Sequence, residues 1–318
     1  MLIAVYLTHP TISCWQITSE QVARLCRSLP DDTITHCATE TEFLQALPRA
    51  EGVLTWEFGR QRLKQAPELR WIATPAAGHE WIDIGSDTTI GVFHGSYHGE
   101  LIGETVLAMM LAQARGVLKA SCLQTLQQWP RVALGQHSRP LRGSHVVIVG
   151  FGNIGRWIAR LAKPFGVRLT GVRRRATKDP AEKLDGAERI VPVTELDRVL
   201  PLADHLVVCL PKTAETDHLI DARRLSLLPR TACVYNVGRG NAIDENALTE
   251  LLRTGRIAGA GLDVFEEEPL AKDSPLRRLP NVLVMPHAAA LSPNYLDLFL
   301  DEFIERIRSG SLANDATR

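Results

Sequence analysis

This 318-residue sequence lacks a net charge, because its 36 lysines and arginines balance its 36 aspartates and glutamates. We therefore expect neither a nucleic acid nor an anionic membrane as a partner. We also expect no secretory leader, because the N-terminal run MLIAVY has no basic segment and is typical of a first strand. The longest apolar stretch, 101–118, contains Glu104, Gln113 and Arg115, which favours a buried helix over a membrane span.

Cysteine is scarce, and its spacing argues against the common metal and redox motifs. The six cysteines, at positions 14, 26, 37, 122, 209 and 233, form no C-x-x-C pair. We expect reduced thiols in a cytoplasmic protein. His94, His98 and Glu100 lie close together in sequence, but Gly95 and Gly99 argue against a fixed helical face, so no metal site is predicted.

A glycine-rich segment follows one of the apolar runs. The run HVVIV ends at position 149, Gly150-Phe-Gly-Asn-Ile-Gly155 follows, and a helical stretch begins at Trp157. The first glycine makes a tight turn, the second lets a pyrophosphate approach the backbone, and the third lets helix and strand pack closely. The helix N-terminus then faces the anion. We predict dinucleotide binding at Gly150, Gly152, Asn153, Ile154 and Gly155.

Three arginines, Arg173, Arg174 and Arg175, end the next strand-like run. Folds that bind NAD place Asp or Glu about 20 residues beyond the glycine motif, where it accepts from the ribose 2′-hydroxyl. Arg173 occupies that place, 18 residues after Gly155 (173 − 155 = 18). A guanidinium pairs with a 2′-phosphate, whereas a solvated basic turn is the alternative interpretation. The position favours NADP(H) over NAD(H).

Strand-like and helix-like runs alternate before about residue 95 and again after residue 145. Such alternation predicts parallel sheets with helices on both faces. A helix over 100–118 leads into the second series. We expect a last helix over 293–308 to return to the first domain, although spacing alone does not establish that return. The fold class is therefore α/β, with two doubly wound domains. A Rossmann cofactor domain (98–287) is inserted into a flavodoxin-like substrate domain (1–97 and 288–318).

Three polar residues follow later strand-like runs: Arg239 in NVGRGNAIDE, Glu268 in GLDVFEEEP, and His287 after Pro286. In doubly wound sheets, ligands bind outside the carboxyl ends of the strands. An arginine, a carboxylate and a histidine at one such edge indicate anion binding and proton transfer. The glycines on either side of Arg239 indicate close approach to a ligand.

The order of these motifs resembles the D-isomer-specific 2-hydroxyacid dehydrogenase family. Behind the glycine motif come LPKTAET from position 210, NVGRGNAIDE from 236, GLDVFEEEP from 261 and the pair Pro286-His287. The similarity covers nearly the whole chain and is closest to short bacterial glyoxylate/hydroxypyruvate reductases. It implies a homodimer formed through the cofactor domain, to which the helix over 101–118 would contribute.

The resemblance also implies roles for the three polar residues. Arg239 would bind the substrate carboxylate and polarise the 2-oxo group. His287 would give its proton to the carbonyl oxygen as hydride arrives from the nicotinamide. Glu268 would hydrogen-bond the other ring nitrogen and favour the imidazolium. The family's catalytic glutamate directly precedes proline, which selects Glu268 over Glu266 and Glu267.

Further binding residues follow from the same resemblance. The segment AAGHEWID from position 76 resembles a glycine loop whose backbone N–H groups hold the carboxylate, although His79 and Glu80 depart from the usual pattern. Trp56 is either a pocket wall or a core tryptophan, and Asp263 either faces the nicotinamide amide or caps a strand end. The remaining predicted contacts are Leu210, Pro211, Thr216, Val237 and Asp263 to the cofactor, and Trp56, Ala77, Gly78 and Arg239 to the substrate.

Together these observations predict an NADPH-dependent reductase of a small 2-oxoacid, whose side chain the sequence does not specify. A dinucleotide-gated, corepressor-like binding protein is one alternative, although such proteins usually carry extensions longer than the tail at 311–318. An NAD-dependent dehydrogenase of another oxoacid, such as phosphoglycerate dehydrogenase, is the second. The missing regulatory extension and Arg173 count against it. Oxidation of formate or phosphite is a remoter alternative.

Overall fold

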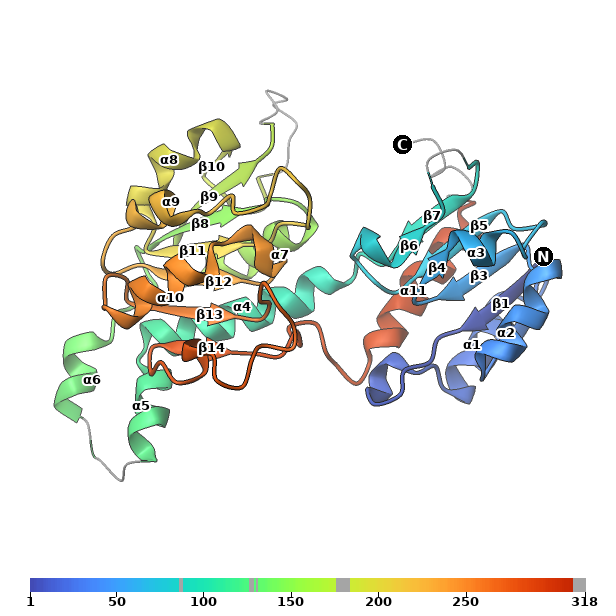
Figure 1. Cartoon of the computed structure of the whole chain (residues 1–318), viewed down its shortest axis with the longest axis horizontal. Coiled ribbons are helices and arrows are strands. Elements are labelled where there is room, and N and C mark those ends of the chain that lie inside the picture. Colours follow the sequence, from blue (N-terminus) through green and yellow to red (C-terminus); the bar gives the residue numbers. More distant parts are fainter. Residues whose placement is uncertain (86–87, 126–128, 130, 176–183, 311–318) are drawn as a thin grey trace. The chain divides into compact units, whose positions relative to one another are not determined.

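Two compact units make up the chain in the computed structural model, which describes residues 1–85, 88–125, 129, 131–175 and 184–310 (Figure 1). Unit 1 comprises Met1–His98 and Leu291–Arg318, and unit 2 comprises Gly99–Ala290. The domain boundaries predicted from sequence lie one residue and three residues from these (97 against 98, and 288 against 291). The tail at 311–318 lies outside the described residues.

Unit 1 contains, within its described residues, a parallel five-stranded sheet in the order β2-β1-β3-β5-β7. This is the flavodoxin-like order of a doubly wound sheet. Its central strands β3 and β5 are buried along their whole length, as parallel strands covered on both faces should be. The strands are β1 (Leu2–Tyr6), β2 (Thr33–His36), β3 (Gly52–Thr55), β5 (Trp71–Thr74) and β7 (Gly91–His94).

The helices of unit 1 include the first and last of the chain. α1 (Ser19–Ser28) begins with the predicted capping box, in which Thr18 and Gln21 each bond the other's backbone N–H. α11 (Tyr295–Arg308) buries Phe299 and Phe303 completely, so the last helix packs within unit 1. The unit also contains α2 (Glu40–Ala46), α3 (Arg60–Leu63) and the short pair β4 (Phe58–Gly59) and β6 (Ile82–Asp83).

Unit 2 is built on a larger parallel sheet, whose described strands follow the order β10-β9-β8-β11-β12-β13-β14. Counted along the chain, the order is 3-2-1-4-5-6-7, which is the Rossmann order extended by one strand. The strands are β8 (His145–Val149), β9 (Arg168–Arg173), β10 (Arg189–Pro192), β11 (His205–Val208), β12 (Cys233–Asn236), β13 (Gly259–Leu262) and β14 (Val282–Val284).

Alternate residues of the central strands enter two separate cores, one on each face of this sheet. In β8, Val147 and Val149 pack into one core, and Val146 and Ile148 pack into the other. Cys209 and Cys233 contact the second core, and burial raises the pKa of their thiols to about 12 and about 11. Both behave as small hydrophobic side chains, as predicted.

The predicted helix over 100–118 is wrong in its extent. α4 (His98–Ala114) ends earlier, because Gly116 adopts a left-handed backbone (φ +70°) that starts a new helix, α5 (Val117–Gln124). No single helix of the described residues is long and apolar enough to cross a membrane, and the pair α4 and α5 that passes by length and composition is bent by 69°.

The other helices of unit 2 are α6 (Arg131–His137), α7 (Asn153–Ala162), α8 (Leu196–Val199), α9 (Ala222–Ser226) and α10 (Glu245–Arg253). α5 and α6 extend away from the sheet (Figure 1). α10 has the predicted bounds, with Asp244 accepting from the Ala247 N–H as its N-cap. Because the sheet is parallel, the carboxyl ends of β8, β9, β11, β12 and β13 lie at one edge, where the predicted site residues follow.

Candidate active site

The glycine motif forms a tight turn between β8 and α7. Gly150 has a φ of +96°, and a Cβ there would lie 2.4 Å from the Cys209 carbonyl oxygen. A Cβ on Gly155 would lie 2.7 Å from the Gly150 oxygen, so this glycine brings helix and strand together. A Cβ on Gly152 would meet nothing within 4 Å, and no side chain caps α7 at this residue. The turn therefore fits a pyrophosphate at the start of α7.

The three arginines follow the end of β9. Arg173 is half-buried at the strand end, whereas Arg174 and Arg175 are exposed. The Glu215 backbone and the Thr213 hydroxyl hold the pKa of the Glu215 carboxyl below its usual range, and Arg174 lowers it further. Arg174 is thus close enough to Glu215 to act on it. Two segments predicted to bind the cofactor are thereby neighbours.

The loop at 211–216 is held by its last threonine. Thr216 Oγ1 accepts from the Thr213 N–H (2.9 Å) and donates to the Pro211 carbonyl (2.7 Å). The side-chain hydrogen bonds of Thr216 therefore stay within the loop. Leu210 is half-buried, Pro211 is exposed, and Val237 is buried at the end of β12.

Arg239 lies in a segment packed tightly against other backbone. A Cβ on Gly238 would lie 2.5 Å from Leu210 backbone atoms, and one on Gly240 would lie 1.8 Å from the Phe265 carbonyl carbon. Protein backbone therefore requires both glycines, whether or not a ligand approaches Arg239. The Arg239 carbonyl accepts from the Asn236 side-chain amide (3.0 Å). This hydrogen bond fixes the Arg239 segment to the end of β12.

Glu268 and His287 form a hydrogen-bonded pair. The Phe265 N–H donates to Glu268 Oε1 (3.0 Å), and Glu268 Oε2 lies 2.7 Å from His287 Nδ1. An ionised carboxylate favours a proton on Nδ1, which makes Nε2 the nitrogen that can exchange a proton with a substrate. The His287 side chain is 47% exposed, so the ring is accessible.

Asp263 holds the segment that carries His287. Its two carboxylate oxygens accept from the N–H groups of Ala288 (2.7 Å) and Ala289 (3.0 Å), and its carbonyl accepts from the His287 N–H. Burial raises the pKa of Asp263, while the two backbone hydrogen bonds oppose that rise. These contacts keep His287 at a φ of +54°, which residues other than glycine rarely adopt.

In unit 1, a threonine links Trp56 to the segment that carries Ala77 and Gly78. Thr74, fully buried at the end of β5, donates from its hydroxyl to the Trp56 carbonyl (3.0 Å) and accepts from the Ala76 N–H (3.3 Å). Ala77 is exposed and Gly78 is half-buried. The Trp56 indole N–H donates to the Trp15 carbonyl, and its ring packs near Trp15 in an aromatic cluster.

The described part of the chain contains no group of three or more His, Cys, Asp or Glu side chains placed to hold a metal ion. His94 packs its ring against His79 (centroids 4.2 Å apart), and burial lowers the pKa of His94 to about 4. His98 Nε2 lies 2.8 Å from the Tyr295 hydroxyl. Gly99 lies within α4, so the sequence argument that Gly95 and Gly99 exclude a helical face is wrong for Gly99.

Sequence reasoning missed two residues that hold the predicted site together, Asn236 and Thr74, and the backbone contacts of a third, Asp263. Asn236 was visible only as the first letter of a motif, although a polar residue at the end of an apolar run is a usable signal. Thr74 had a similar position after a buried strand. The backbone contacts of Asp263 had no sequence signal, because they join it to residues 25 and 26 positions away.

Comparison with known proteins agrees with this arrangement. Residues 107–289 match the model of the D-isomer specific 2-hydroxyacid dehydrogenase NAD binding domain. A glyoxylate reductase of Aeropyrum pernix is 38% identical over 269 residues, covering 82% of this chain and 77% of the relative. One of Thermococcus onnurineus is 39% identical over 230 residues, covering 70% of this chain and 67% of the relative.

Solved structures show the same architecture. A D-isomer specific 2-hydroxyacid dehydrogenase from Xanthobacter autotrophicus, in complex with NADPH and MES, superimposes with a TM-score of 0.79 and 28% identity, covering 97% of this chain and 95% of that one. A probable 2-hydroxyacid dehydrogenase from Rhizobium etli, in complex with NADP, HEPES and L(+)-tartaric acid, gives a TM-score of 0.76 and 26% identity, covering 97% and 95%.

Proposed function

Because the chain belongs to the D-isomer-specific 2-hydroxyacid dehydrogenase family, an oxidoreductase family, we propose that it reduces a small 2-oxoacid to the D-2-hydroxyacid with NADPH. Glyoxylate and hydroxypyruvate are the proposed substrates, since several relatives are glyoxylate reductases. The observation that carries the proposal is the 2.7 Å contact between His287 and Glu268, which supplies a proton donor at the carboxyl edge of a dinucleotide-binding sheet.

Three side chains of unit 2 perform the proposed chemistry. A bound nicotinamide dinucleotide supplies the hydride. His287 gives a proton from Nε2 to the carbonyl oxygen, and Glu268 stabilises the protonated ring through Nδ1. Arg239 binds the substrate carboxylate with its planar set of donors and polarises the 2-oxo group. In unit 1, we assign carboxylate binding to the backbone N–H groups at Ala77 and Gly78.

We propose NADP(H) as the preferred cofactor. Arg173 is the last residue of the second strand of the Rossmann order, where an NAD enzyme needs an acceptor for the ribose hydroxyls. Arg174 and Arg175 add exposed positive charge beside it. Bound NADP(H) in two of the similar structures supports the same choice.

We also propose a homodimer formed through unit 2. Large hydrophobic side chains are exposed on α5, on α6 and between them, with exposures of 58% for Val117, 75% for Val132 and 92% for Trp129. Exposed apolar side chains gathered on one projecting helix pair favour a protein–protein contact at this place. α5 and α6 extend from the sheet, which makes them accessible to a second copy (Figure 1).

The test is a screen of purified protein for NADPH oxidation with glyoxylate, hydroxypyruvate, pyruvate and longer 2-oxoacids. We expect the highest kcat/KM with one of the first two. The same screen with NADH separates cofactor preference from substrate preference. Absence of turnover with every 2-oxoacid and both cofactors would refute the proposed function.

A further inference from the structure

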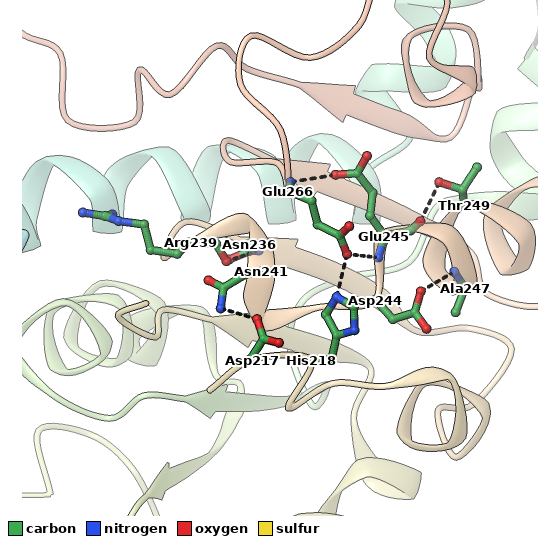
Figure 2. A network of polar contacts seen from close by, with 10 residues as sticks. All are labelled: Asp217, His218, Asn236, Arg239, Asn241, Asp244, Glu245, Ala247, Thr249 and Glu266. Carbon is green, nitrogen blue, oxygen red and sulfur yellow. Dashed lines mark hydrogen bonds and ion pairs between the residues drawn. The ribbon is translucent and has the colours of Figure 1, made fainter. Parts of the chain in front are cut away.

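A second histidine–glutamate pair lies close to the catalytic segments. His218 Nε2 is 2.9 Å from Glu266 Oε1. The same oxygen accepts from the Glu245 N–H (3.1 Å), and the Glu266 N–H donates to Glu245 Oε2 (3.1 Å). Figure 2 shows His218, Glu266 and Glu245 turned toward one another, while Arg239 extends away from them. We call these three residues the His218 cluster.

The backbone of His218 is joined to the segment that carries Arg239. The His218 N–H donates to the Asn241 carbonyl (2.7 Å), and the Asn241 side-chain amide donates to the Asp217 carboxylate (2.9 Å). Asn241 is two residues after Arg239. His218 therefore holds the Arg239 segment through its main chain and the Glu266 segment through its ring.

The Glu266 segment also carries the catalytic glutamate. Glu266 directly follows Phe265, whose N–H donates to Glu268 Oε1, and Glu268 contacts His287. Gly240 packs closely against the Phe265 backbone, so the Arg239 segment and the Glu266 segment already touch at one point. Glu245, at the end of the Arg239 segment, ties them at a second point through its two hydrogen bonds with Glu266. The His218 ring adds a third contact, on the same Glu266 oxygen, which restrains that side chain from another direction.

Stability alone does not account for His218. Its side chain is 49% exposed and that of Glu266 is 33% exposed, and ion pairs at such exposure contribute little to folding. His218 also adopts a φ of +43°, a conformation that costs free energy for any residue with a Cβ. Strained residues of this kind occur most often at functional sites.

We propose that His218 is a positioning residue, whose hydrogen bond to Glu266 sets the orientation of the Glu268 segment relative to Arg239. This inference rests on the proposed function for its effect on turnover. A small misplacement of catalytic groups costs up to about 10²-fold in rate. We expect an intermediate loss, of about tenfold in kcat, when the hydrogen bond is removed.

Two substitutions separate positioning from stability. Asn tolerates the left-handed backbone better than Gln does, but its amide is one methylene too short to reach Glu266. The side-chain amide of Gln places an N–H donor at nearly the same distance from the Cα atom as His Nε2. Positioning predicts that kcat for 2-oxoacid reduction falls about tenfold in His218→Asn and stays within about threefold of wild type in His218→Gln. A purely structural role predicts the opposite order, with Asn at least as active as Gln.

The matched control is Arg253→Gln, which removes another exposed ion pair of unit 2, with Glu250 on α10. Its kcat should stay within twofold of wild type. The melting temperatures of both His218 variants and their KM for NADPH should stay close to those of wild type. Equal kcat in the Asn and Gln variants, or higher kcat in Asn, would overturn the inference.

A second readout does not require turnover. The His287 Nδ1 proton shared with Glu268 should give a downfield proton NMR signal, identified by its absence from His287→Gln. We expect that signal to weaken or move in His218→Asn and to persist in His218→Gln. An unchanged signal in His218→Asn refutes positioning even if the wild type reduces no 2-oxoacid, whereas a wild type without turnover refutes only the proposed function.

Discussion

His287 combines an accessible ring with a constrained backbone. Its φ of +54° is maintained by hydrogen bonds from its own N–H and those of the next two residues to Asp263, while Glu268 holds Nδ1. A side chain fixed at both ends loses little freedom when a substrate binds, which is what efficient proton transfer requires.

Replacing His287 with Ala should therefore remove the proton donor and leave the cofactor site intact. We expect a loss of about 10²–10⁴-fold in kcat for the best 2-oxoacid. NADPH affinity, measured by fluorescence titration, should change less than threefold. Turnover near that of wild type would assign proton donation to another group.

Cofactor preference is also decided by single residues. Each charge-assisted contact from an arginine to the 2′-phosphate should contribute about 1.5–3 kcal/mol, so two contacts separate NADPH from NADH by about 10²-fold or more in kcat/KM. Arg173→Asp should remove most of that preference, mainly through a higher KM for NADPH. Arg198→Asp, at an exposed arginine of α8, is the charge-matched control. A wild type that prefers NADH would refute the assignment.

Several residue-level features were predictable from the sequence, and others were not. The order of Arg239, Glu268 and His287 follows from local motifs, which a sequence displays directly. The requirement for glycine at position 240 comes from Phe265, 25 residues away (265 − 240 = 25), and the contact of His218 with Glu266 spans 48 positions. Such contacts depend on how segments meet in space, which local patterns do not encode.

At the scale of elements, buried parallel strands were the easiest to predict. The apolar runs at 71–74 and 91–94 predict strands with the bounds that β5 and β7 have, because short apolar runs between polar turns leave few alternatives. β10 was missed, since Arg189–Pro192 is an edge strand with polar ends and a proline. The end of α4 was missed because an apolar run continues through Gly116 while the backbone changes direction.

A buried histidine of β11, His205, makes the free energy of unfolding depend on pH. Burial lowers the pKa of His205 to about 4, and its Nδ1 lies 3.1 Å from the Tyr235 hydroxyl. In the unfolded chain His205 has the ordinary histidine pKa of about 6.5. As the pH falls, the unfolded chain therefore binds a proton at this residue before the folded protein does. The stability that this neutral ring contributes is therefore complete above about pH 6.5 and is lost progressively toward pH 4.

Between pH 7 and pH 5, the titration of His205 alone should lower the free energy of unfolding by about 2 kcal/mol. Burial shifts the pKa of His145 in the same direction, so the wild type should lose more in total. His205→Gln should show a smaller fall in melting temperature over this range than wild type. His137→Gln, which removes an exposed imidazole of α6, should not. Equal falls in wild type and His205→Gln would contradict the assignment.

The whole molecule shows which kinds of information a single sequence carries. Two α/β units, one interrupting the other, follow from the two series of alternating runs and from a last helix that returns to unit 1. Surface properties were harder to foresee. The helix over 101–118 was expected to contribute to a dimer. Within that range Val106, Met109 and Met110 are buried in unit 2, whereas Val117, the first residue of α5, is 58% exposed.

These exposed side chains make the dimer testable. In sedimentation, the wild type should behave as a particle of about 70 kDa, twice the 35.1 kDa of one chain. Charges at Val117 and Val132 would have to be desolvated in a dimer interface, so Val117→Asp combined with Val132→Asp should shift the mass to that of one chain. Leu202→Asp, at a residue 50% exposed after α8, should leave the wild-type mass unchanged. A monomeric wild type, or a double variant that still dimerises, would place any self-association elsewhere than α5 and α6.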